Sequence, residues 1–285
     1  PAAVMRETTR RADSKYEGGE RMETKSNAKL KALFIIPSIT GIILFMIPVK
    51  NADGDWTVVV KILADIISGY IGGFLPLLGA GHRVGKGDTI ILESCEYCNS
   101  FLNFFPTAAV ILDVDADHLD FFKDLEDIRH SFHQFSALLP SDGTLIINGD
   151  IKDYQEIYEG LDCNVITYGS SAEFDYSATE IQYDEKGFVS FELLKHNTSC
   201  GRVQLSVTGD HNVSNALAAI ATAELLGIPM DTIRKGLLSF SGTDRRFEYK
   251  GTFNGVTVVD DYAHHPTEIA ATLKAAQHYP HNEIW

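Results

Sequence analysis

The distribution of hydrophobic and polar positions divides the chain into two parts. Residues 32–49 (A-L-F-I-I-P-S-I-T-G-I-I-L-F-M-I-P-V) contain no charged side chain and lie between Lys29, Lys31 and Lys50. From residue 87 onward, short β-branched runs alternate with helical stretches, a pattern typical of a parallel sheet covered by helices. We therefore predict an α/β fold with a mostly parallel sheet flanked by helices, preceded by an apolar segment.

The α/β part contains recognisable strand and helix patterns. Strands are predicted at residues 89–93, 108–113, 144–148, 164–168 and 256–260. Helices are predicted near residues 125–139, 154–161, 212–226, 230–240 and 267–278. Residues 174–208 alternate polar and apolar positions around a turn at 185–187, which predicts a small antiparallel sheet that interrupts the parallel one.

The apolar segment allows two interpretations. Its length is the lower limit for a membrane-spanning helix, so residues 32–49 predict a membrane span. Pro37, Gly41 and Pro48 favour the alternative of a buried helix or a pair of buried strands, because each weakens a continuous helix. Residues 1–28 mix both signs of charge without a period, and we expect them to form a disordered tail.

Charge separates the same two parts. Residues 1–70 carry a net charge of +2 and residues 71–285 a net charge of −17, giving −15 for the chain. An acidic body argues against nonspecific nucleic-acid binding, because phosphate contacts need clustered Lys and Arg. The four cysteines are too few and too scattered for a secreted disulfide framework, which fits a reducing compartment such as the cytoplasm.

Two acidic clusters follow successive predicted strands. One is I-L-E-S-C-E-Y at residues 91–97 and the other is D-V-D-A-D-H-L-D at residues 113–120. Open parallel sheets bind ligands at the carboxyl ends of their strands, so both clusters should face one crevice. Glu93 and His118 form a donor set suited to Mg²⁺ carrying nucleotide phosphates. For any single Asp, a solvated acidic loop is the alternative.

Two further strings carry candidate binding groups. In G-D-H-N-V-S-N-A, which opens a helix, Asn212 and Asn215 offer the donors and acceptors that an adenine edge requires. Simple capping of the helix by Asp210 or Asn212 is the alternative. The string G-T-D-R-R-F-E at residues 242–248 carries paired arginines, the residue type that clamps phosphates.

A strand through those arginines would point Arg245 and Arg246 to opposite faces. Only one of them would then reach the crevice, and Arg245 would pair with a surface carboxylate. The string D-D-Y-A-H-H-P-T-E at residues 260–268 follows. It concentrates two carboxylates and two imidazoles on one loop, which favours a ligand-binding role.

These strings, in this order, resemble the central domain of the Mur ligase family over residues 72–285. The specific matches include E-S-C-E-Y-C-N-S-F-L, D-A-D-H-L-D-F-F-K, T-G-D-H-N-V-S-N-A-L, G-T-D-R-R-F-E-Y and V-D-D-Y-A-H-H-P-T-E-I. The branch of the family that these strings resemble joins L-alanine to UDP-N-acetylmuramate. The resemblance implies that ATP phosphorylates the sugar carboxylate and that the amine of L-alanine attacks the acyl phosphate, in the cytoplasm.

The resemblance also implies cofactors and roles for individual residues. The resemblance implies a ligase that uses ATP and Mg²⁺. The ligase would act in peptidoglycan synthesis, and so in cell wall biogenesis, cell shape and cell division. Mg²⁺ is expected at Glu93 and His118, and catalytic roles at Arg246 and His118. ATP contacts are expected at His211, Asn212, Asn215, Arg246 and Asp261. Contacts to the UDP-sugar or L-alanine are expected at Glu96, Tyr97, His264 and His265.

The sequence also departs from the family pattern. The family's phosphate loop, G-T-H-G-K-T-T-T, is not found in it. We therefore expect residues 72–254 to be a central domain without that loop, residues 255–285 to begin a truncated C-terminal Rossmann-like domain, and the chain alone to be inactive. Residues 29–71 are similar instead to YjiH-type membrane proteins of the nucleoside-recognition gate family. A membrane-anchored or transporter-derived protein, with the acidic domain as a binding module, is the alternative function.

Overall fold

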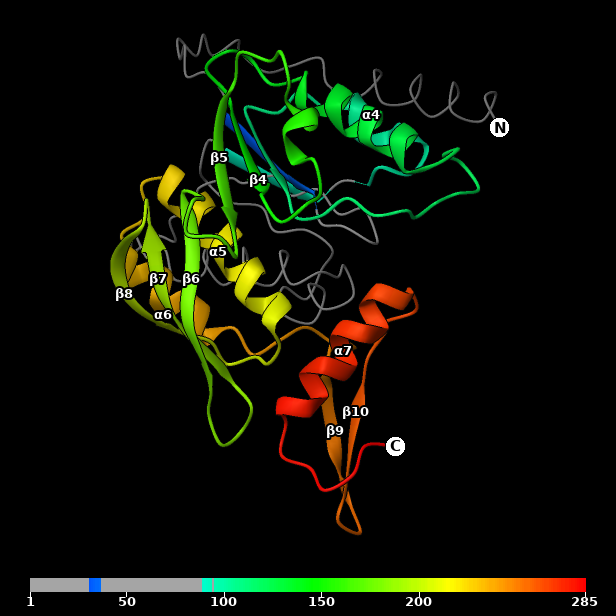
Figure 1. Cartoon of the computed structure of the whole chain (residues 1–285), viewed down its shortest axis with the longest axis vertical. Coiled ribbons are helices and arrows are strands. Elements are labelled where there is room, and N and C mark those ends of the chain that lie inside the picture. The colour runs from blue at the N-terminus through cyan, green and yellow to red at the C-terminus, as the bar shows by residue number, and fades with distance from the viewer. Residues whose placement is uncertain (1–30, 37–88, 94) are drawn as a thin grey trace, which may run out of the picture.

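A computed structural model of the chain describes residues 31–36, 89–93 and 95–285 (Figure 1). The expected tail over residues 1–28 lies outside these ranges, as do most of residues 29–71 and the junction around residue 72.

One mixed sheet of eight strands organises most of the described chain. Its order is β2-β1-β3-β4-β5-β6-β7-β8. Pairing is parallel from β2 to β6 and antiparallel from β6 to β8. The strands are β1 (Lys31–Ile36), β2 (Thr89–Glu93), β3 (Ala108–Ile111), β4 (Thr144–Asn148), β5 (Asn164–Gly169), β6 (Tyr176–Tyr183), β7 (Val189–Lys195) and β8 (Thr198–Gln204). The predicted fold class is therefore confirmed.

The antiparallel strands extend the parallel sheet rather than interrupt it. Strand β6 joins β5 through only two residue pairs, Tyr168 with Tyr176 and Gly169 with Ser177. Beyond that short contact, β6, β7 and β8 form a meander in which polar and apolar positions alternate. Burial alternates along β7, where Val189, Phe191 and Leu193 are buried, as expected for an antiparallel strand with one face on the core.

Strand β1 corrects the interpretation of the apolar segment. Residues 31–36 do not begin a membrane helix but pair in parallel with β2 on one side and β3 on the other. The alternative of a strand is right for these residues, because two neighbouring strands satisfy their backbone donors and acceptors. Residues 37–49 lie outside the described residues. Among the helices that are described, none combines the length and apolar character needed to cross a membrane.

Helices cover both faces of the sheet. In β3, Ala108 and Val110 contribute to one buried cluster and Ala109 and Ile111 to the other, because successive side chains of a strand point to opposite faces. Helices α5 (Asp210–Leu225) and α6 (Met230–Ser239) pack on the first face, and α4 (Leu125–Ser136) with the 3₁₀ segment η1 (Tyr97–Asn103) packs on the second.

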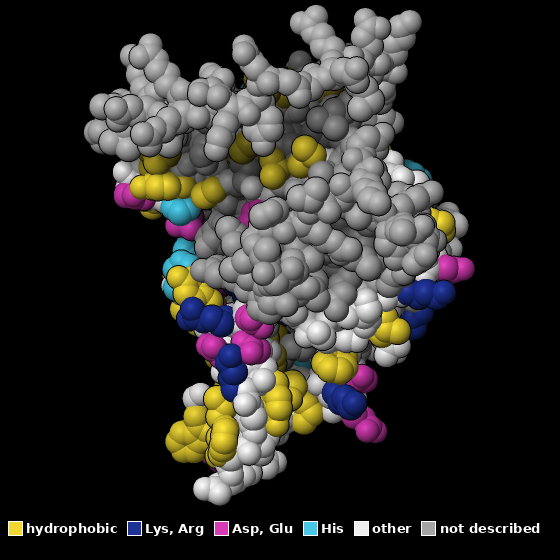
Figure 2. All heavy atoms as spheres, turned by 180° about the vertical axis from the view of Figure 1, so that it is seen from behind, with side chains coloured by type: hydrophobic (Ala, Val, Ile, Leu, Met, Phe, Trp, Pro, Cys, Tyr) yellow, Lys and Arg dark blue, Asp and Glu magenta, His cyan; other side chains and the backbone are white. Residues whose placement is uncertain are grey.

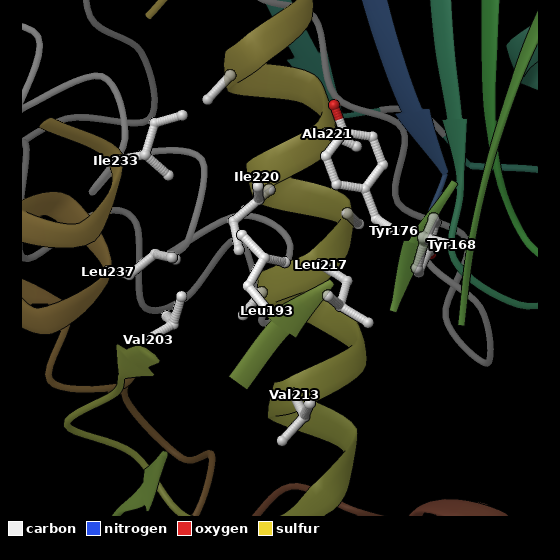
Figure 3. Packing of buried hydrophobic residues seen from close by; sticks show 14 of the residues in the cluster. Tyr168, Tyr176, Leu193, Val203, Val213, Leu217, Ile220, Ala221, Ile233 and Leu237 are labelled. Atoms are coloured by element: carbon white, nitrogen blue, oxygen red, sulfur yellow. The ribbon is translucent and has the colours of Figure 1, made fainter. Parts of the chain in front are cut away.

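The larger cluster is built around α5. Figure 3 shows Leu217 and Ile220 of this helix beside Leu193 of β7, with Ile233 and Leu237 of α6 to their left. The helix is apolar around most of its circumference, because it lies between the sheet and α6. The expected helix near residues 154–161 is reduced to a short 3₁₀ segment, η2 (Tyr154–Ile157).

A second unit follows, consisting of the antiparallel pair β9 (Glu248–Phe253) and β10 (Val256–Asp260) and the helix α7 (Pro266–His278). The two-residue turn between the strands places Asn254 and Gly255 at φ angles of 51° and 83°, as tight hairpins require. Figure 2 shows hydrophobic side chains gathered on the protruding end of the molecule where this hairpin lies. Tyr249, Phe253 and Val256 are among its exposed residues.

A small set of contacts fixes α7 against the larger sheet. Lys274 Nζ lies 2.5 Å from Asp210 Oδ2 at the start of α5, and the Tyr183 hydroxyl also donates to Asp210. The ring of His278 stacks on Tyr183 with ring centroids 3.8 Å apart. These contacts position the second unit beside the start of α5.

Candidate functional site

A cleft of about 1160 Å³ lies where the second unit meets the larger sheet. Its walls come from the carboxyl ends of β3 and β4, the first turns of α5, residues 240–249, and α7. All five residues expected to contact ATP line it, namely His211, Asn212, Asn215, Arg246 and Asp261. This is the edge of the sheet where open parallel sheets bind ligands.

The first turn of α5 forms one wall of the cleft. Gly209 precedes the helix with a φ of 94°, and a Cβ atom there would lie 2.5 Å from Cε1 of His211, so the turn needs glycine. Asn212 Nδ2 donates to the Thr208 carbonyl at 2.7 Å, and Asn215 Nδ2 donates to Asn212 Oδ1 at 3.4 Å. The two asparagines thus fix each other's amide orientation.

The opposite wall holds Arg246 against α7. Its guanidinium Nη1 lies 3.1 Å from Glu268 Oε1, and only 20% and 9% of the two side chains are exposed. Burial raises the pKa of Glu268. The hydrogen bond from the His264 N–H and the Arg246 charge lower that pKa by more, so the pKa is held below its usual range. Glu268 therefore stays ionised and fixes the position of Arg246 at the cleft.

Asp261 is held beside Arg246 by three hydrogen bonds. It accepts from the backbone N–H groups of Phe247 at 2.9 Å and Ala263 at 2.8 Å, and from the Thr272 hydroxyl at 3.1 Å. These contacts tie the loop before β9, the loop after β10 and α7 together around one carboxylate. They place Asp261 rigidly in the cleft wall.

The two arginines do diverge, but not for the predicted reason. Arg245 pairs with the half-exposed Asp260 at 3.8 Å and lies over the Tyr262 ring, whereas Arg246 lines the cleft. Strand alternation is the wrong explanation, because β9 begins only at Glu248. Arg245 has a φ of 59°, so a left-handed turn residue separates the two side chains.

The loops after β2 and β3 meet at a second location. His118 Nε2 lies 3.7 Å from Glu96 Oε1, and the Tyr97 hydroxyl donates to Asp120 at 2.9 Å. The rings of Tyr97 and His118 are in contact, with centroids 4.8 Å apart. The expectation that the two acidic clusters face each other holds for these residues, although β1 stands between β2 and β3.

The electrostatics of this second location favour a bound cation. Glu93 Oε1, Glu96 Oε2 and His118 Nε2 are buried and have no hydrogen-bond partner in the described part of the chain. Burial raises the pKa of Glu93 to about 8, and burial also raises that of Glu96. Since a nearby positive charge would favour ionised carboxylates, the adjacent Glu96 and His118 fit a divalent cation.

Cys95 borders the same group without suiting Mg²⁺. Burial, reinforced by the Glu96 charge, raises the pKa of its thiol to about 11. Oxygen atoms are the ligands that Mg²⁺ prefers, so the expected Mg²⁺ ligands Glu93 and His118 stay a prediction. The sequence prediction placed Glu96 with the substrate contacts, whereas the structure places its carboxylate against His118.

The two histidines before α7 lie outside the cleft lining. His265 caps the helix: its Nδ1 accepts from the Thr267 N–H at 3.4 Å, and the Glu268 side chain completes a capping box. His264 is largely exposed, and its Nδ1 lies 3.2 Å from the Tyr262 carbonyl oxygen. Their predicted substrate contacts stay a prediction, and the structure gives His265 a structural task as well.

The cleft also contains residues that the motifs did not single out. Asn148, Thr208 and Thr243 line it, and Asn148 Nδ2 donates to the Leu112 carbonyl at 2.9 Å. Asn148 is the last residue of a predicted strand, and ligands bind at the carboxyl ends of parallel strands. Its position alone could therefore have identified it. Thr243 belongs to the same string as the paired arginines, but only the charged residues of that string were considered.

The cleft carries more acidic than basic side chains. Its acidic residues are Asp113, Asp150, Glu185, Asp244, Glu248, Asp261 and Glu268, and its cations are Lys186 and Arg246. A polyphosphate would be repelled by such walls unless a divalent cation accompanied it.

Two domain families match the chain. The Mur ligase middle domain matches residues 82–223, and the glutamate ligase domain of Mur ligases matches residues 245–285. The chain belongs to the Mur ligase family. The matched ranges begin after residue 71, so they give no support to the resemblance of residues 29–71 to YjiH-type proteins.

Relatives of this Mur ligase chain share one name. It is 56% identical over 216 residues to a UDP-N-acetylmuramate--L-alanine ligase from Lachnospira eligens, covering 75% of this chain and 47% of that protein. The protein of the same name from Lachnoclostridium phytofermentans is 52% identical over 225 residues, covering 75% and 48%. The chain thus spans about half the length of the curated relatives it matches.

Solved structures share the fold. A MurF structure from Acinetobacter baumannii superposes with a TM-score of 0.57 at 26% identity, covering 64% of this Mur ligase chain and 39% of that chain. A UDP-N-acetylmuramate-alanine ligase from Thermotoga maritima superposes with a TM-score of 0.61 at 20% identity, covering 97% and 57%. The second likeness concerns the fold alone.

Proposed function

We propose that this chain is part of an ATP-dependent ligase that joins L-alanine to UDP-N-acetylmuramate in peptidoglycan synthesis. The cleft carries the proposal, because the five residues expected to contact ATP line it together. The names of the relatives from L. eligens and L. phytofermentans support the choice of substrates. A cytoplasmic location, where ATP is available, is part of the proposal.

In the proposed complex, ATP occupies the cleft between α5 and α7. Asn215 offers the amide donor and acceptor that an adenine edge needs, and Asn212 fixes the orientation of that amide. Asp261 accepts from a ribose hydroxyl while its three protein hydrogen bonds hold it in place. His211 lies in the same wall as a further nucleotide contact.

Arg246 acts on the phosphates. Its planar guanidinium can hold two phosphate oxygens at once, and the ion pair with Glu268 prevents the side chain from turning away. A fixed positive charge stabilises a transferring phosphoryl group without reorganising during the step. Arg246 is therefore the residue we assign to the formation of the acyl phosphate.

Mg²⁺ would be held by Glu93, Glu96 and His118, whose buried unpartnered donors fit such an ion. When bound, it neutralises charge on the ATP phosphates. Tyr97 lies against His118 and next to Asp120, where it can contact the UDP-sugar or L-alanine. We propose the same substrate side for His264 and His265.

A membrane-anchored binding module is less consistent with the structure. Strand β1 uses the first part of the apolar segment inside the sheet, so those residues are not available as a membrane anchor. The nucleotide-type cleft would also have no role in a module that only attaches to a membrane.

The test uses a version of the protein with the full length of its relatives. We expect phosphate release from ATP that requires both UDP-N-acetylmuramate and L-alanine. Arg246→Ala should lower that rate by roughly 100-fold or more, whereas Arg245→Ala, the matched control, should leave it nearly intact. Phosphate release that ignores either substrate would refute the proposed reaction, and equal losses in both variants would refute the role of Arg246.

A further inference from the structure

The group at the meeting of the β2 and β3 loops contains a sulfur donor that the proposed Mg²⁺ site does not use. One donor atom each from Cys95, Glu96 and His118 lies within 4.8 Å of the other two. In the described part of the chain, these three side chains are close enough together to surround one ion. It combines one sulfur, one oxygen and one nitrogen ligand.

Two of these donors, on Glu96 and His118, are buried without a hydrogen-bond partner among the described residues. Glu96 is 5% exposed, and Glu96 Oε2 and His118 Nε2 have no hydrogen-bond partner in the described chain. Leaving such atoms unpaired in a buried position is unfavourable. Their proximity to Cys95 thus indicates a ligand that binds all three side chains.

We propose that Cys95, Glu96 and His118 form a binding site for Zn²⁺. Thiolate, imidazole and carboxylate are its usual ligands, with bond lengths of about 2.0–2.3 Å. Four-coordinate geometry with three protein ligands leaves one position for water. Binding displaces the thiol proton, as metal binding to cysteine generally does.

The donor set distinguishes this site from a magnesium site. Mg²⁺ selects oxygen ligands and near-octahedral geometry, whereas thiolate sulfur selects zinc and other soft ions. Glu96 and His118 belong to both sets, so Zn²⁺ and Mg²⁺ should exclude each other there. This competition rests on the proposed function, whereas the zinc site itself does not.

Cobalt titration of the purified chain tests the zinc site, because Co²⁺ substitutes for Zn²⁺ and a thiolate ligand gives it a near-ultraviolet charge-transfer band. We expect one Co²⁺ per chain, the sulfur band, displacement by Zn²⁺ and no displacement by a hundredfold excess of Mg²⁺. Cys95→Ser should remove the band and weaken binding at least about tenfold. Cys98→Ser is the matched control, since Cys98 is exposed and outside the group, and it should change neither.

The contrary results are distinct. A sulfur band that survives Cys95→Ser, or one that Cys98→Ser removes equally, would overturn the assignment, and so would the absence of Co²⁺ binding by the folded chain. Circular dichroism of each variant confirms that it is folded. In the full-length ligase, Zn²⁺ should inhibit the Mg²⁺-supported reaction more strongly than it inhibits Cys95→Ser, each relative to its own zinc-free rate. Equal inhibition would overturn the competition alone, while the cobalt spectra decide the site.

Discussion

Removing Arg246 should destabilise the fold as well as the proposed reaction. The Arg246 and Glu268 side chains are 20% and 9% exposed, and their charged atoms are 3.1 Å apart. In Arg246→Ala, Glu268 would keep the backbone donors His264 N–H and His265 N–H at 3.1 and 3.4 Å. It would lose its charged partner in a site that water reaches poorly.

The magnitude follows from that geometry. Removing one partner of a fully buried pair destabilises by about 3–5 kcal/mol, and an exposed pair contributes about 0–1 kcal/mol. Because two backbone donors remain on Glu268, we expect a loss of about 2 kcal/mol in the free energy of unfolding. Arg245→Ala should lose at most about 1 kcal/mol, since Arg245 and Asp260 are 53% and 38% exposed and 3.8 Å apart.

Urea denaturation of the two variants measures this difference. With a slope of about 2 kcal/mol per molar urea, Arg246→Ala should lower the midpoint by about 1 M. Adding Glu268→Gln to Arg246→Ala should restore part of the loss, because it removes the unpaired charge and keeps a side chain able to cap α7. Equal midpoints for the two arginine variants, or a further loss in the double variant, would refute the reasoning.

Two further predictions concern stability. The pKa of Glu268 is lowered, despite burial, by the His264 N–H bond and the Arg246 charge. The stabilisation that Glu268 gives to the fold is therefore present above the ordinary Glu pKa of about 4.5. That stabilisation is lost as the pH falls through the lower pKa of Glu268 in the folded chain. The unfolding free energies of the unmodified chain and Glu268→Gln should converge as the pH falls below about 4.5, and a constant difference would contradict this. In the core, Leu217→Ala should destabilise by about 3 kcal/mol, because Leu217 is 2% exposed. Leu225→Ala on the same helix should cost under about 1 kcal/mol, because Leu225 is 40% exposed; equal urea midpoints would contradict the packing of α5.

The sequence determined the elements whose hydrophobic pattern is strong. The predicted bounds of β2 and β4 agree with the structure, and α5 and α6 lie within about two residues of their predicted ranges. Strands buried on both faces carry continuous apolar runs, and helices packed on a sheet carry an apolar period. Both patterns can be recognised without knowing which elements pack against them. The strand expected through the paired arginines was placed too early in the chain, because β9 begins only at Glu248.

The motifs also determined which residues line the cleft. Asn212, Asn215, Arg246 and Asp261 belong to short strings of unusual polar composition, and the structure brings them together. The order of the strands places the carboxyl ends of β3 and β4 at one edge, and parallel pairing then gathers the loops that follow. Local patterns and connection rules were sufficient for that part of the site.

Tertiary structure alone decided three other features. The apolar residues 31–36 become a strand because β2 and β3 flank them, and hydropathy contains no information about partners so distant in the chain. Arg245 and Arg246 separate through a positive φ angle in a non-glycine residue, which surrounding contacts impose against the local preference. Glu96, Cys95 and His118 meet only because two loops from different strands fold over the same edge.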